Sequence, residues 1–214
     1  MISISVVVVL IMLLFGVVGY LRGWQREVIA LSGLIASVAL LQWFGVPIVD
    51  IVGRFTGMPD NCAIDPLIQC KQEFWIQAVL HAVMAFFSFQ VVTRIAFQVV
   101  GSRAGDRLRA TFEKQIIGAG VGLLNGYLLA GTMWGFLEYQ LSAAGYQRLQ
   151  QGLAGAGQCL QGYMFDLSVI TRPLTACDPV VTSLADYLPM GIFSPTLWLL
   201  AFFIIFFVVI VALI

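Results

Sequence analysis

The sequence predicts an all-α polytopic membrane protein with four to five transmembrane helices and a small disulfide-pinned outer segment. Hydrophobic residues make up 60% of the 214 residues, and the chain contains only 11 basic (Lys and Arg) and 11 acidic residues. A spanning helix needs about 20 mostly apolar residues, because the hydrocarbon core is about 30 Å thick and each helical residue rises about 1.5 Å. Five runs meet or approach this requirement, at residues 2–21, 28–49, 74–100, 116–139 and 197–214.

The first and last runs need separate arguments. No basic residue precedes the first run, and no small-residue cleavage site follows it at Gly19-Tyr20-Leu21-Arg22, so we expect a retained helix rather than a signal peptide. The last run has 18 residues and no charged flank. It is either a fifth span or a re-entrant or surface helix, with Pro195 suited to its start and Trp198 to the membrane interface.

The distribution of basic residues predicts the orientation in the membrane. The turn between the first two helices carries Arg22 and Arg26, whereas the link between helices two and three and the segment after helix four are richer in Asp and Glu. The link between helices three and four contains Arg103, Arg107, Arg109 and Lys114. Because basic residues concentrate in cytoplasmic loops, the first and third links should be cytoplasmic and the N-terminus outside.

Four cysteines provide a second indication of topology. Cys62, Cys70, Cys159 and Cys177 all lie in segments predicted to be outside, where thiols can be oxidised. An even number suggests two disulfides with three possible pairings, of which we favour Cys62–Cys70 with Cys159–Cys177. Cross-pairing, which would join the two outer segments, and four free thiols are the alternatives. The spacings are too wide for a typical metal site, so we expect no bound metal.

Helix four carries a ladder of glycines. Gly118, Gly122 and Gly126 recur every four residues, and Gly131 and Gly135 repeat the spacing. Residues four apart lie on one helix face, which predicts a flat surface for close helix packing. The partner is either another helix of this chain, which we favour, or a second copy of the protein.

Several polar residues fall inside the predicted spans. They are Gln77, His81, Gln90 and Arg94 in helix three and Asn125 in helix four. Such groups usually face protein or water. Arg94 is placed to snorkel to the headgroups, and Asn125 could form a hydrogen bond across helices beside the glycine ladder. We interpret His81 as a structural contact, with a proton carrier as the alternative.

Catalytic signatures are missing from the sequence. It contains no Gly-x-Ser-x-Gly elbow, His-Glu-x-x-His helix, phosphate-binding loop with Lys, or pair of membrane aspartates. A single His excludes most acid–base dyads. The net charge of zero and pI of about 6.5 offer no basic patch for nucleic acid. We therefore expect a protein without enzymatic activity or cofactor.

The turn after helix one resembles a known family. The motif Gly16-x-x-x-Tyr20-x-Arg22-Gly23-Trp24-x-Arg26-Glu27, followed by an apolar helix with Gly33, resembles the opening of the colicin V production protein (CvpA) family. The resemblance continues at Gly105-Asp106-Arg107 and in the glycine ladder, and covers roughly residues 5–140. Asn125-Gly126 stands where members often have Arg-Gly. We therefore divide the chain into a CvpA-like four-helix unit (1–140), an extracytoplasmic cap (141–196) and a C-terminal helix (197–214).

The cap itself has a mixed pattern. Leu141, Tyr146, Leu149 and Leu153 fall near a 3.6-residue period, which predicts a helix at its start. Four prolines interrupt the remainder, at positions 173, 179, 189 and 195. We expect short helices on the outer face rather than an independent enzyme domain.

The resemblance implies a bacterial inner-membrane protein linked to toxin production or secretion and to envelope maintenance. We expect a scaffold or accessory subunit that contacts membrane lipids and either a membrane-protein partner or a second copy. Two alternatives remain: a small channel or transporter subunit with a polar path along His81, Gln90, Arg94 and Asn125, and a helical subunit of a larger complex. In the motif, Arg22 and Arg26 hold the turn inside, and Glu27 suits the start of helix two and can pair with either Arg.

Overall fold

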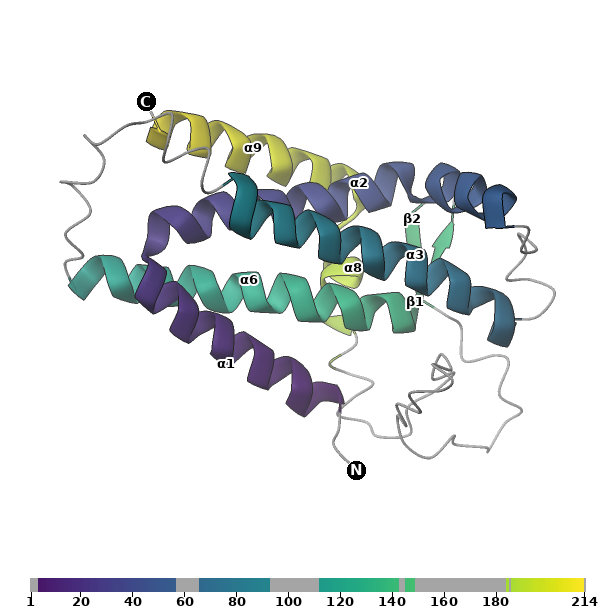
Figure 1. Cartoon of the computed structure of the whole chain (residues 1–214), viewed down its shortest axis with the longest axis horizontal. Helices are drawn as coiled ribbons and strands as arrows, with labels where there is room; N and C mark the ends of the chain where they lie inside the picture. The colour runs from purple at the N-terminus through teal and green to yellow at the C-terminus, as the bar shows by residue number, and fades with distance from the viewer. Residues whose placement is uncertain are drawn as a thin grey trace.

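The computed structural model describes residues 4–56, 66–92, 112–142, 145–148, 184 and 186–213. Its long helices are α1 (Ile4–Arg22), α2 (Trp24–Thr56), α3 (Pro66–Phe87), α6 (Phe112–Glu138) and α9 (Pro195–Leu213), and α3 continues into a π-helix, η1 (Ser88–Val92). A hairpin of β1 (Tyr139–Ser142) and β2 (Gly145–Arg148) and the short helix α8 (Pro189–Ile192) complete it. Successive long helices run in opposite directions, so the fold is an antiparallel helical bundle (Figure 1).

A single glycine makes the turn between α1 and α2. Gly23 has φ of +82°, a conformation that is unfavourable for residues with a Cβ. Its N–H donates a hydrogen bond to the carbonyl oxygen of Gly19 at 2.9 Å, which closes the end of α1. The Arg22-Gly23 step of the motif is therefore a tight helix reversal, with α2 beginning at the next residue.

The glycine ladder of α6 packs against α1 of the same chain. A Cβ on Gly118 would lie 2.5 Å from the carbonyl oxygen of Gly19, and one on Gly126 would lie 2.7 Å from the Cα of Met12. A Cβ on Gly122 would collide with the carbonyl oxygen of Phe15. The two backbones therefore touch directly, and dispersion contacts along this seam hold α1 to α6.

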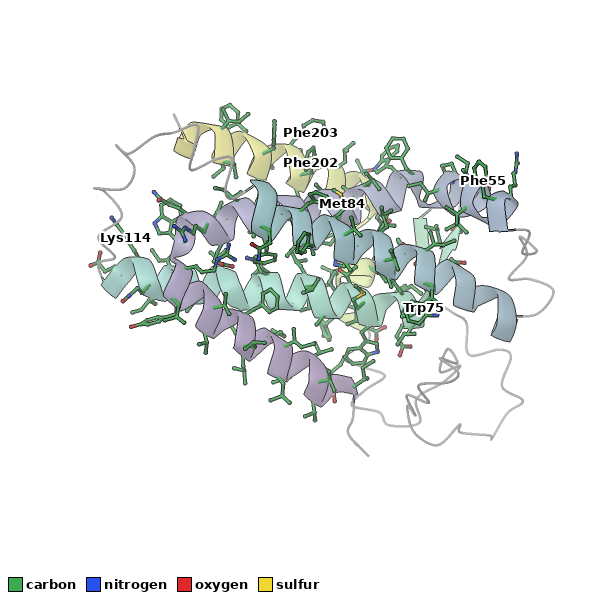
Figure 2. All side chains as sticks on the ribbon, in the orientation of Figure 1. Phe55, Trp75, Met84, Lys114, Phe202 and Phe203 are labelled. Atoms are coloured by element: carbon green, nitrogen blue, oxygen red, sulfur yellow. The ribbon has the colours of Figure 1, made fainter. Side chains whose placement is uncertain are left out.

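Apolar residues cover both the core and much of the surface. Leu34 and Val38 are fully buried in α2, which packs against α3, α6 and α9. Leu13 of α1 and Phe203 of α9 are exposed. Figure 2 shows Phe203 on the outer side of α9. Within the described residues, three helices are long and apolar enough to cross a membrane: Ile4–Arg22, Trp24–Phe55 and Glu113–Glu138. The all-α prediction is confirmed at this level, and the count of four to five spans stays a prediction.

Two helices are longer than the sequence predicted. α2 continues through Pro47 and Asp50 to Thr56, and α3 begins at Pro66 rather than at residue 74. The polar residues at these ends are compatible with helix because they lie at one end of the bundle, beyond its apolar middle. His81 therefore lies 15 residues after the start of α3.

The predicted helix at the start of the cap is wrong for residues 141–142 and 145–148, which form strands. There β1 pairs with β2 in an antiparallel hairpin, with Leu141 opposite Tyr146. Gly145, the first residue of β2, has φ of +103°. The Leu141 side chain packs against Gly45 of α2, where an added Cβ would lie 2.8 Å from it. The positive φ of Gly145 and the contacts of β1 with α2 and α3 favour a hairpin, and they outweigh the weak helical period of the sequence.

Some predicted residues lie outside the described residues. These are Cys62, Cys159 and Cys177, the side chain of Cys70, Arg94, and the Asp106-Arg107 part of the motif. The disulfides therefore stay a prediction.

Candidate functional site

The motif at the α1–α2 turn builds a buried polar cluster around Glu27. This residue has no exposed surface. Its Oε1 lies 3.2 Å from Nη1 of Arg22, the last residue of α1. From α6, the amide Nδ2 of Asn125 donates to Glu27 Oε2 at 2.8 Å and to the Glu27 backbone carbonyl at 3.0 Å. One carboxylate thus joins three helices.

Arg22 extends this cluster to the end of α3. Its Nη2 donates a hydrogen bond to the carbonyl oxygen of Phe89 at 3.1 Å, and its guanidinium lies 5.3 Å from the centre of the Phe89 ring. Phe15 packs edge-on against the same ring. Phe89 lies in η1, and π-helical turns, which are rare, often occur at functional sites. We call Arg22, Glu27, Phe89 and Asn125 the Arg22 clamp.

The energetics of the Arg22 clamp favour a fixed geometry. A charge buried away from water is tolerated only when it is paired and hydrogen-bonded. Glu27 has both kinds of partner, and its place in the first turn of α2 adds the favourable helix dipole. Arg26, the second basic residue of the motif, is exposed and does not share this burial.

Halfway along the bundle, His81 forms a second interhelical contact. Its Nδ1 lies 2.8 Å from Ser37 Oγ of α2, and its ring packs edge-on against Phe136 of α6. The imidazole also faces the backbone of Leu128. His81 has no exposed surface. It therefore touches α2 and α6 from α3 and lies away from the bundle surface.

A third set of polar contacts lies near the hairpin. Glu73 accepts hydrogen bonds from Gln77 Nε2 at 2.9 Å and from the backbone N–H of Leu141 in β1 at 3.0 Å. Trp134 Nε1 donates to Glu138 Oε1 at 3.1 Å. Glu73, Gln77 and His81 are four residues apart, so α3 turns one polar stripe toward its neighbours. We call these three residues the α3 stripe.

Sequence reasoning identified some of these residues and missed others. Asn125 and His81 were predicted, but Ser37 was not considered, and Glu73 was assigned to a loop. The four-residue spacing of the α3 stripe is the signal that could have found Glu73. Gln90 lies exposed in η1, while His81 and Asn125 bind different partners. The described residues therefore do not bring the predicted polar path together.

The described residues also show no metal centre. Among them, no group of three or more His, Cys, Asp or Glu side chains is placed to hold a metal ion. The chemistry that the site performs is interhelical: ion pairing, amide hydrogen bonding and aromatic packing. Each of these interactions fixes one helix against another.

A comparison with known protein families identifies the family of this chain. A protein-family model described as Colicin V production protein matches residues 4–153. The chain belongs to the colicin V production protein family. No curated protein and no solved structure matches it. The family match includes every residue of the Arg22 clamp, the glycine ladder and the hairpin, and ends before α8 and α9.

Proposed function

We propose that this colicin V production family member is a non-enzymatic inner-membrane scaffold or accessory subunit that supports toxin secretion and envelope maintenance. The observation that carries the proposal is the Arg22 clamp. Its charged and amide groups bind one another and fix four segments of the family unit. Because the motif residues hold the helices of this chain against one another, the protein is suited to presenting a rigid surface to partners.

The proposal includes a multi-pass topology with the N-terminus outside. The antiparallel bundle supports it, because the basic α1–α2 turn, the end of η1 and the start of α6 lie at one end (Figure 1). The α2–α3 link begins and ends at the other end, as the predicted disulfides require. The division into a four-helix unit, a cap and a C-terminal helix belongs to the same proposal.

We include α3 among the spanning helices for a structural reason. The α3 stripe lowers its mean hydropathy, but those three side chains are buried against α2, α6 and β1. The opposite face carries exposed apolar side chains, including Val79, Val83 and Phe86. Only that face would meet lipid, and it is apolar.

Toxin secretion tests the proposal. The host is a strain that secretes a colicin V-type toxin and has lost its own family member. We expect this chain to restore the ratio of extracellular to intracellular toxin. Gly122→Leu should fail because it pushes α1 from α6, and Gly120→Leu should succeed because a Cβ at Gly120 meets no described atom within 4 Å. An unchanged ratio with the wild-type chain inserted in the membrane would refute the proposal.

A channel or transporter subunit is the second candidate. Among the described residues, Gln77 Oε1 and Thr132 Oγ1 are buried without a hydrogen-bond partner, so bound water is their natural partner. Water between α2, α3 and α6 is what a polar path would need. Proton or ion flux through proteoliposomes that His81→Ala abolishes would favour this candidate, and absence of flux across a broad solute panel would count against it.

A further inference from the structure

We propose that the groove between α1 and α3 binds one acyl chain of an anionic phospholipid. The groove has a volume of about 730 Å³, within the range of small-molecule sites. α1 forms one wall, α3 and η1 form the other, and α6 forms the floor. Figure 1 shows α1 and α3 on either side of α6. This site depends on the chain lying in a membrane and not on the proposed role in secretion.

The groove follows from how the helices are held. The glycine ladder draws α1 onto α6, while α3 packs mainly on α2, so α1 and α3 are left apart. Where they would otherwise meet, Ala82 and Ala85 of α3 and Ala130 of α6 provide only methyl groups. The Arg22–Phe89 contact joins the two walls at one end and closes the groove there.

The lining selects an apolar ligand. Apart from Arg22 and Gln90 at one end, the groove is lined by aliphatic and aromatic side chains. Several of them are also exposed on the bundle surface, including Val7 and Leu14 of α1 and Phe86 of α3. The groove is therefore open sideways, toward the bilayer. An apolar groove facing lipid is filled, because an empty one forfeits dispersion contacts along both walls.

Its dimensions fit a lipid chain better than a protein helix. The lining extends along α1 from Ile4 to Arg22, which is about 27 Å at about 1.5 Å per residue. One leaflet contributes about half of the roughly 30 Å hydrocarbon core, so a single acyl chain fits lengthwise. A helix about 10 Å across and equally long needs about 2,000 Å³. A helix from a second copy would therefore enter the groove only in part, whereas a single acyl chain can lie within it.

The charge at the closed end favours an anionic headgroup. Arg22 is the last residue of α1 there, and Arg26 follows in the first turn of α2. Lys114 lies at the same end of the bundle, near the start of α6 (Figure 2). Two acidic residues, Glu27 and Glu113, stand against these three basic ones. Basic groups at a membrane surface attract anionic lipid.

Native mass spectrometry of the full chain tests the proposal. The protein is incubated in mild detergent with phosphatidylglycerol or with phosphatidylcholine that has the same acyl chains. We expect one retained phosphatidylglycerol and about tenfold weaker retention of phosphatidylcholine. Ala82→Trp should weaken phosphatidylglycerol binding about tenfold by filling the groove. Val83→Trp, on the neighbouring exposed position outside the lining, should not.

Each other result overturns part or all of the proposal. Equal binding by Ala82→Trp and Val83→Trp, or no retained lipid in the wild type, overturns the site. Equal retention of the two lipids overturns the anionic headgroup. A dimer that Ala82→Trp dissociates assigns the groove to a second copy. If Ala82→Trp does not fold, Leu129→Phe on the floor of the groove is measured in its place.

Discussion

Glu27 is the residue whose environment has the clearest energetic consequence. Replacing Arg22 with Met leaves a buried carboxylate with only its Asn125 partner. We expect Arg22→Met to lower the free energy of unfolding by about 3 kcal/mol, the lower end for a broken buried ion pair, because the Arg22 side chain is 24% exposed. Unfolding in mixed detergent micelles, followed by circular dichroism, measures this loss.

The double variant separates the ion pair from packing. Arg22→Met with Glu27→Met removes both charges, and such a replacement is often neutral or stabilising, so it should recover much of the loss. Arg54→Met, at an exposed position of α2, is the matched control and should change stability by less than about 0.5 kcal/mol. A double variant as unstable as Arg22→Met alone would contradict the pairing.

His81 and Ser37 are expected to act as one interhelical contact. In a double-mutant cycle of Ser37→Ala and His81→Phe, we expect a coupling free energy of about 0.6 kcal/mol, the average for polar pairs between membrane helices. Unfolding of the wild type, the two single variants and the double variant in detergent gives the four free energies of the cycle. Additive effects of the two substitutions would mean that the 2.8 Å contact does not contribute to stability.

The packing of α1 against α6 depends on glycines in both helices. We expect Gly122→Leu to destabilise the protein by at least about 3 kcal/mol, because its side chain would enter the space of the Phe15 backbone and force the helices apart. Gly120→Leu puts the same side chain on the same helix in open space, and should be neutral or slightly stabilising because leucine favours helix. Equal effects in detergent unfolding would show that the seam is not close-packed.

Sequence alone predicted the elements whose signals are local. The Arg22-Gly23 turn and the glycine ladder were predictable because each depends on neighbouring residues and a fixed spacing. The hairpin was not, because Leu141 is held by Glu73, which lies 68 residues earlier. The Arg22 clamp likewise joins Glu27 to Asn125 across 98 residues. Such contacts depend on tertiary packing and leave only weak local signals.

The five long antiparallel helices of the described residues make the orientation of the protein testable at both ends of the bundle. We replace the four native cysteines with Ser and introduce one Cys at Gln25 or at Ser194. Positions in the basic turn should be cytoplasmic, so Gln25→Cys should resist a membrane-impermeant maleimide in intact cells and react after lysis. Ser194→Cys, at an exposed position directly before α9, should react in intact cells.

The two positions control for each other. Ser194 directly precedes α9, which runs antiparallel to α6 (Figure 1), so one span separates it from the end of the bundle that holds the α1–α2 turn. If Gln25→Cys reacts in intact cells and the second position does not, the orientation is the reverse of the predicted one. The native cysteines would then face the reducing cytoplasm, where disulfides are rare. Equal labelling of both would mean that the chain does not span as a bundle. Only unlabelled Gln25→Cys with labelled Ser194→Cys agrees with both the basic turn and the proposed disulfides.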